Sequence, residues 1–212
     1  MVASTDNYFN QYPATLHLNP RPDDEVEFRQ GQEEVQCLEE MLRERFDSWK
    51  HVNGGDSLPR RIIFFRDGLS MEQFEMCRTR ELRQLQNCIT KVYGDVQKAE
   101  PEILLICCVK RHHCRFYRPD SNTKNNHFTT GKENQDNPVT GVTVFQGVTY
   151  GKNQDFFLVS QDTIKGTTRP THYVVLHNGI KTKVKEEAGD AMRDITIYDI
   201  AKMVCTSNTL PS

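Results

Sequence analysis

The sequence lacks any long hydrophobic run. Its longest unbroken apolar stretch runs from Ile103 to Val109, which is far shorter than the roughly 20 residues that a membrane-spanning helix needs. No charged segment followed by an apolar one opens the chain, as it would in a secretory leader. We therefore expect a soluble, cytoplasmic protein that makes no membrane contact.

Paired cysteines and a large net charge are also missing. The seven cysteines are odd in number and include no C-x-x-C pair, which argues against a disulfide framework and predicts reduced thiols packed in a core. The net charge is only −2, so the molecule as a whole is not an obvious binder of polyanions. Any contact with nucleic acid must come from a local patch of basic residues.

Several motifs for nucleotide and metal chemistry are absent. The chain contains no G-x-x-x-x-G-K-[ST], no G-x-G-x-x-G and no H-E-x-x-H, so triphosphatase, dinucleotide and zinc-protease functions lose their usual support. A zinc site is disfavoured because His112, His113 and Cys114 are consecutive, and three successive residues rarely surround one tetrahedral ion. A Cys/His hydrolase is disfavoured because nothing in the sequence places a base against Cys114.

Hydrophobic periodicity predicts a mixed α/β fold in a chain of 212 residues without repeats or a break in composition. Apolar residues at steps of three and four predict amphipathic helices over 32–50, 70–94 and 186–205. Strands are expected over 14–18, 61–66, 102–109, 142–145, 155–160 and 172–176. The polar, asparagine-rich segment 118–141 is predicted to be an exposed insertion.

One stretch, residues 59–73, joins a strand, an acid and a helix start. The β-branched and aromatic run over 61–66 is typical of a buried strand, and Asp67 follows it, where α/β sheets commonly present chemistry. Ser70 and Gln73 match the S-x-x-Q capping box. Asp67 is therefore either a structural residue of this turn or a ligand for Mg²⁺, which prefers oxygen ligands. Glu33 and Glu34, at a predicted helix start, are the next acidic candidates, although helix N-termini favour acids for dipole reasons alone.

Two further segments concentrate hydrogen-bond donors. The sequence K-R-H-H-C-R, residues 110–115, comes directly after the strand 102–109 and predicts phosphate contacts at the end of the sheet where Asp67 lies. The alternative is a solvated run of charge at a strand exit. The turn G-T-T-R-P-T-H-Y, residues 166–173, adds Arg169, which either contacts phosphate or a base, or belongs to ordinary turn hydrogen bonding.

Together, these three motifs resemble the Piwi domain of Argonaute proteins. The segments IIFFRDGLSMEQF, VKRHHCRFY and GTTRPTHYVVL occur in this order and are similar to the family sequences IIFYRDGVS, QKRHHTRLF and GTSRPTHYHVL. The resemblance implies an RNase H-like mixed sheet flanked by helices. It also implies RNA-mediated gene silencing with a small guide RNA, a complementary target RNA and silencing-complex proteins as partners. In active members it implies a Mg²⁺-dependent endoribonuclease.

The resemblance also implies roles for individual residues. Asp67 matches the family's second catalytic aspartate, a metal ligand, and Glu33 looks like the family's glutamate finger, with Glu34 as the alternative. The residues predicted to contact nucleic acid are Lys110, Arg111, His113, Arg115 and Arg169.

Two of the family's four catalytic side chains have no counterpart in the sequence. The first catalytic aspartate belongs to an ADVTHP-like strand, and the final histidine follows a PAPAYYAH-like segment; neither segment occurs here. We therefore interpret residues 1–212 as a partial Piwi domain, lacking the start and end of that domain, which binds guide and target nucleic acid but does not cleave alone. Two alternatives stay open. One is an active guided endoribonuclease (slicer), completed by a longer chain or a partner, and the other is a degenerate protein-interaction module.

Overall fold

The structure, a computed structural model, describes most of the chain in eight segments. They are residues 1–19, 34–117, 137–150, 154–163, 166–181, 184–185, 192–193 and 198–201. Glu33 and residues 118–136 of the predicted insertion lie outside the described residues. The chain divides into two compact units, one formed by Met1–Ile62 with Ser70–Ile103 and the other by Ile63–Leu69 with Leu104–Ser212.

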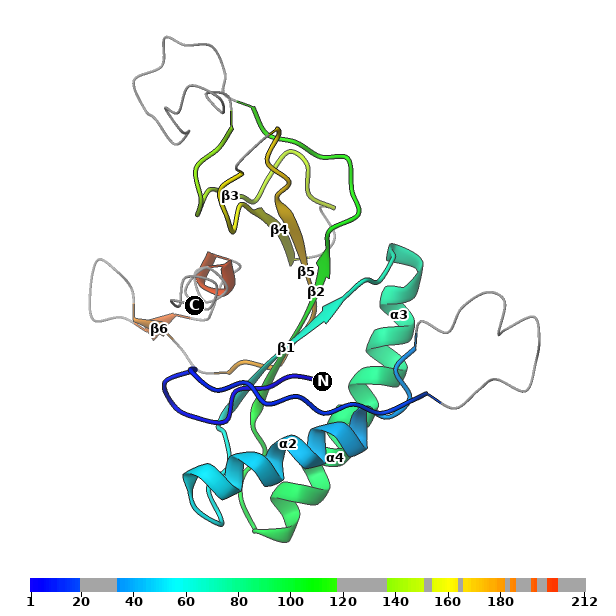
Figure 1. The fold of residues 1–212 in the computed structure, drawn as a ribbon, viewed down its shortest axis with the longest axis vertical. Helices are drawn as coiled ribbons and strands as arrows, with labels where there is room; N and C mark the ends of the chain where they lie inside the picture. The colour runs from blue at the N-terminus through cyan, green and yellow to red at the C-terminus, as the bar shows by residue number, and fades with distance from the viewer. Residues whose placement is uncertain are drawn as a thin grey trace, which may run out of the picture. The chain divides into compact units, whose positions relative to one another are not determined.

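The first unit is built on two helices that lie side by side, α2 (Leu38–Asn53) and α4 (Leu82–Asp95) (Figure 1). Their apolar faces meet where the ring of Phe46 packs edge-on against that of Tyr93, with centroids 5.7 Å apart. The predicted helix over 32–50 begins later, at Leu38. The N–H groups of Val35 and Leu38 donate instead to side chains of the other helical segment, at Glu81 and Gln84.

The helix predicted over 70–94 forms but is not uniform. It starts with the predicted capping box, in which the Ser70 N–H donates to Gln73 Oε1 at 2.8 Å, so that prediction is confirmed. A 3₁₀ turn η1 (Met71–Gln73), a short α3 (Phe74–Met76) and a π turn η2 (Cys77–Glu81) precede α4. The π turn carries the buried carboxylate of Glu81, which accepts the Val35 N–H at 2.9 Å.

The strand predicted over 14–18 is wrong. The N-terminal segment makes a single bridge between Val2 and Ala14, and Leu16 and Leu18 are 87% and 86% exposed. The carboxylate of Asp6 accepts backbone N–H groups from three of the next residues and turns the chain there. An alternation of apolar and polar residues makes a strand only where a neighbour covers the apolar face, and none of the described residues covers Leu16 and Leu18.

Within the described residues, the sheet has five strands in the order β1-β2-β5-β4-β3. They are β1 (Arg61–Asp67), β2 (Glu102–Val109), β3 (Thr143–Val144), β4 (Gln154–Leu158) and β5 (Thr171–Asn178). The pairs β2–β5, β4–β5 and β3–β4 are antiparallel. Strands β1 and β2 run in the same direction, because the Glu102 N–H donates to the Arg60 carbonyl at their starts while Lys110 meets Asp67 at their ends. The predicted mixed sheet is therefore confirmed.

Strand β1 is not buried as predicted. It lies at the edge of the sheet and alternates between exposed and half-buried residues, so Ile63 and Phe65 are 39% and 42% exposed. The continuous apolar run of β2 is buried along almost its whole length, as expected for an inner strand.

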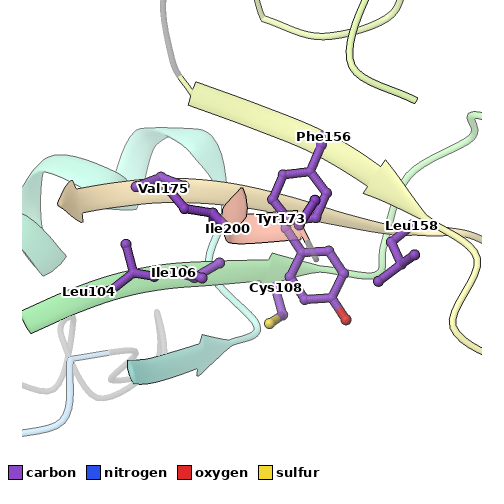
Figure 2. Close-up of a cluster of buried hydrophobic side chains, with 9 residues drawn as sticks. Leu104, Ile106, Cys108, Phe156, Leu158, Tyr173, Val175 and Ile200 are labelled. Atoms are coloured by element: carbon purple, nitrogen blue, oxygen red, sulfur yellow. The ribbon is translucent and has the colours of Figure 1, made fainter. Parts of the chain in front are cut away.

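The core of the second unit forms where side chains of β2, β4 and β5 gather on one side of the sheet (Figure 2). The ring of Phe156 stacks on that of Tyr173, with centroids 5.2 Å apart, and Ile200 completes the cluster. The prediction of one helix over 186–205 is wrong in part. Within that range, β7 (Met192–Arg193) is a strand, which pairs with β6 (Val184–Lys185) just before it. Among the described residues of the range, only 198–201 are helical.

None of the cysteines in the described residues forms a disulfide bond, in agreement with the predicted reduced thiols. Four of them, Cys77, Cys88, Cys107 and Cys108, are buried. Burial raises the pKa of Cys88 to about 11 and that of Cys108 to about 12. Within the described residues, no helix is both long enough and apolar enough to span a bilayer.

Candidate nucleic-acid interface

The pairing of β2 with β5 brings the two predicted basic segments to one end of the sheet. Val109, the last residue of β2, lies opposite His172, near the start of β5. The exit segment (residues 110–117, after β2) and the β5 turn (residues 166–170, before β5) therefore meet at that end. Asp67, the last residue of β1, lies there too, as the sequence predicted.

Asp67 is paired with a cation. A carboxylate oxygen of Asp67 lies 2.9 Å from Lys110 Nζ, and the two side chains are 60% and 63% exposed. The hydrogen bond to Asp67 raises the pKa of Lys110, so the ammonium stays charged.

The described residues do not fit a divalent metal ion at this place. Among them, no group of three or more histidine, cysteine, aspartate or glutamate side chains is arranged to hold one. Mg²⁺ needs oxygen ligands and tolerates few geometries, whereas the partner that the structure gives Asp67 is an ammonium. The metal and catalytic roles of Asp67 and Glu33 therefore stay predictions.

Three basic side chains are exposed around this end of the sheet. Arg111 and His113 belong to the exit segment and Arg169 to the β5 turn, and all three are exposed. The electrostatic effects of Arg115, His113 and Arg169 reach His112 and add to its burial in lowering the pKa of that histidine. Arg169 and Arg115, which belong to different segments, therefore both act on the same histidine.

Arg115 points into its own segment. Its Nη1 donates to the carbonyl oxygens of His112, at 3.2 Å, and Cys114, at 2.6 Å, and the residue is half-buried. The guanidinium thus holds the shape of the exit segment. Its predicted phosphate contact stays a prediction, and this second role was not visible in the sequence.

A buried hydrogen-bonded pair, formed by a histidine and an aspartate, was not predicted from the sequence. His172 Nε2 lies 2.6 Å from Asp155 Oδ2, and both side chains are almost fully buried. The Tyr150 N–H donates to the same carboxylate oxygen at 3.0 Å. Burial lowers the pKa of His172, although the hydrogen bond from His172 to Asp155 opposes that shift. The sequence did contain one signal for this pair: Asp155 is an acid at the start of the apolar run D-F-F-L-V-S.

The β5 turn is held by a residue of the predicted insertion. Asn137 Nδ2 donates to the Gly166 carbonyl at 2.8 Å, and the Thr168 N–H donates to Asn137 Oδ1 at 3.0 Å. Gly166 has a φ of +84°, a conformation that glycine adopts readily. Because Asn137 is only 6% exposed, the prediction of an exposed insertion over 118–141 is wrong for this residue.

Comparison with known proteins places the chain in a family. Residues 24–210 match the Piwi domain. Protein argonaute 7 of Arabidopsis thaliana is 36% identical over 146 residues, which are 68% of this chain and 13% of the relative. Protein argonaute of Schizosaccharomyces pombe is 31% identical over 181 residues, which are 85% of this chain and 19% of the relative.

The fold agrees with the sequence match. A crystal structure of Kluyveromyces polysporus Argonaute with a guide RNA has a TM-score of 0.68 and 25% identity, over 85% of this chain and 21% of that one. The predicted RNase H-like sheet is thereby confirmed. The chain spans less than a quarter of the length of each of these three proteins. The family model covers most of the sequence, and the chain belongs to the Piwi domain family of the Argonaute proteins.

Proposed function

We propose that this chain is the part of a small-RNA-guided silencing protein that holds the backbones of guide and target RNA. The observation that carries the proposal is the convergence of exposed Arg111, His113 and Arg169 at one end of the sheet, where β2 pairs with β5. Phosphate contacts of this kind position RNA without reading its sequence, which suits a protein whose specificity comes from a guide.

The relatives support this choice of ligand. Two of them carry the name argonaute, and the similar K. polysporus structure was solved with a guide RNA. Guide RNA, complementary target RNA and further proteins of a silencing complex are the partners that we propose for this chain.

The charge distribution determines how the binding should behave. The net charge is −2, so long-range attraction of RNA is weak and the local basic region must supply the affinity. Lys110 is held by Asp67 and Arg115 by carbonyl oxygens. A few phosphate contacts remain, and each displaces counterions, so affinity should fall as salt rises.

We further propose that the chain does not cleave RNA by itself. Asp67 is engaged by Lys110, and the described residues supply no cluster of metal ligands. An endoribonuclease site with Mg²⁺ would need acids from outside the described residues, such as Glu33, or from a partner protein.

The test uses one labelled target RNA, alone and paired with a complementary guide RNA, in the presence of Mg²⁺. We expect binding that weakens from about 50 mM to about 200 mM salt, with no cleavage. An absence of binding at low salt would overturn the proposal and favour a protein-interaction module. Guide-dependent cleavage that Asp67→Ala abolishes would overturn its second half and establish an active slicer.

The proposal includes a cytoplasmic location. Cys77, Cys88, Cys107 and Cys108 are buried and form no disulfide bonds, as is usual for proteins of a reducing compartment. Fractionation of cells that produce the chain should recover it with cytoplasmic markers, and recovery from a secretory compartment would contradict this part.

A further inference from the structure

We infer that His112 is a positioning residue, which joins the exit segment to the β5 turn so that their basic side chains meet one RNA backbone together. The inference rests on the proposed function. It concerns a side chain that the sequence presented as part of the basic segment 110–115 and as a disfavoured zinc ligand.

One hydrogen bond makes the connection. His112 Nε2 lies 2.8 Å from the carbonyl oxygen of Pro170, which is 58 positions later in the sequence. A carbonyl oxygen only accepts hydrogen bonds, so Nε2 carries the hydrogen and donates it. Nδ1 of the same ring is buried and has no partner in the part of the chain that the structure describes, which leaves the link to Pro170 as the polar contact of this ring.

Packing fixes the same ring. His112 lies edge-on to Phe157, with ring centroids 5.2 Å apart. Phe116, at the other end of the exit segment, packs edge-on against Phe157 as well, at 5.6 Å. Phe157 itself is stacked on His172 at 4.1 Å, with an angle of 5° between the rings. The exit segment therefore packs at two points against Phe157 of β4.

The sequence neighbours of His112 and Pro170 suggest what their hydrogen bond does. His112 lies between Arg111 and His113, which are exposed, and Pro170 directly follows the exposed Arg169. A single hydrogen bond thus connects the neighbours of two arginines that belong to different segments. Holding these arginines in place before RNA arrives reduces the entropy lost on binding.

Two variants separate the hydrogen bond from the packing. His112→Phe keeps an aromatic ring against Phe157 but removes the donor, whereas His112→Gln keeps an N–H donor and removes the ring. Hydrogen exchange of residues 1–212 in the absence of RNA is the first readout. We expect faster exchange in both 110–117 and 166–171 for His112→Phe, and a smaller effect for His112→Gln. Unchanged exchange in His112→Phe would overturn the inference, whatever the protein does with RNA.

Binding of single-stranded RNA as a function of salt is the second readout. His112→Phe should weaken binding about threefold to tenfold without changing the slope of log affinity against log salt, because no phosphate contact is lost. Arg111→Gln should flatten that slope. A general loss of stability would not produce this contrast, in which one variant changes only the affinity and the other also changes the salt slope.

The matched control is Ile106→Val, a conservative change in the middle of β2 that touches neither segment. It should leave RNA affinity within about twofold of wild type. Wild-type affinity in His112→Phe would overturn the inference while the proposed function stands. A wild-type chain that fails to bind RNA would overturn the proposed function, and the exchange experiment would still decide whether His112 couples the two segments.

Discussion

Lys110 Nζ lies 2.9 Å from a carboxylate oxygen of Asp67, at the ends of two neighbouring strands that run in the same direction. Both side chains are more than half exposed, and ion pairs of that kind contribute only about 0–1 kcal/mol to stability. The pair matters more for RNA binding, because Asp67 neutralises the positive charge of Lys110.

Asp67→Asn should therefore strengthen RNA binding. Without the carboxylate, Lys110 is available for a phosphate, and in EDTA we expect affinity for single-stranded RNA to rise about threefold, with a salt slope steeper by about 0.7. Asp162→Asn, which changes another exposed acid of the same unit, is the control and should change affinity less. Weaker binding in Asp67→Asn would show that the carboxylate itself contributes to RNA binding.

Arg111 and Arg115 should behave differently although they are close in sequence. Arg111 is exposed, so Arg111→Gln should flatten the salt slope by about 0.7. Arg115 donates to two carbonyl oxygens, so Arg115→Gln should leave the slope unchanged and speed proteolysis within 112–116. A flatter slope in Arg115→Gln would mean that this guanidinium contacts phosphate, as its sequence position suggested.

Asp155→Ala should strongly destabilise the second unit. The substitution leaves the buried His172 ring and the Tyr150 N–H without their acceptor, and each buried polar group that loses its partner costs about 1–3 kcal/mol. Urea denaturation followed by circular dichroism measures this loss. Asp162→Ala removes an acid that accepts from Thr140 on the surface and should cost less than about 1 kcal/mol. Equal midpoints for the two variants would refute a structural role for the buried pair.

The second unit should lose stability in mild acid. Burial lowers the pKa of His112, His172 and His177 below the ordinary histidine value of 6.5. The unfolded chain therefore binds more protons than the folded one as pH falls below 6.5, and folding becomes less favourable. The melting temperature should fall as the pH is lowered from about 7 to about 5.5 and should change little above about pH 7. A rise toward acid would show that Asp155 stabilises a charged His172 in the folded state.

The positions of β2 and of Asp67 could be predicted from the sequence, because both depend on local signals. The run E-I-L-L-I-C-C-V has the bounds of β2, and Asp67 ends β1 because glycine follows it with a φ of +88°. The basic exit segment and the β5 turn were recognisable in the same way, since each adjoins a strand with a clear apolar pattern.

The remaining features depend on contacts between distant residues. Nothing local shows that Arg115 turns toward carbonyl oxygens, that His112 reaches Pro170 or that Asp155 meets His172. Leu16 and Leu18 have a strand-like alternation but remain exposed, because a strand needs a neighbour as well as a pattern. Strand β7 likewise lies within a predicted helix, because its two residues pair with those of β6.

The most direct measurement of the central claim is the salt dependence of RNA binding by the wild-type chain and by the Arg111→Gln/Arg169→Gln double variant. If the exit segment and the β5 turn hold one RNA backbone together, the slope of log affinity against log salt should fall in magnitude by about 1.4, or about 0.7 for each lost contact with single-stranded RNA. Identical slopes for the two proteins, or wild-type binding that does not respond to salt, would contradict the account.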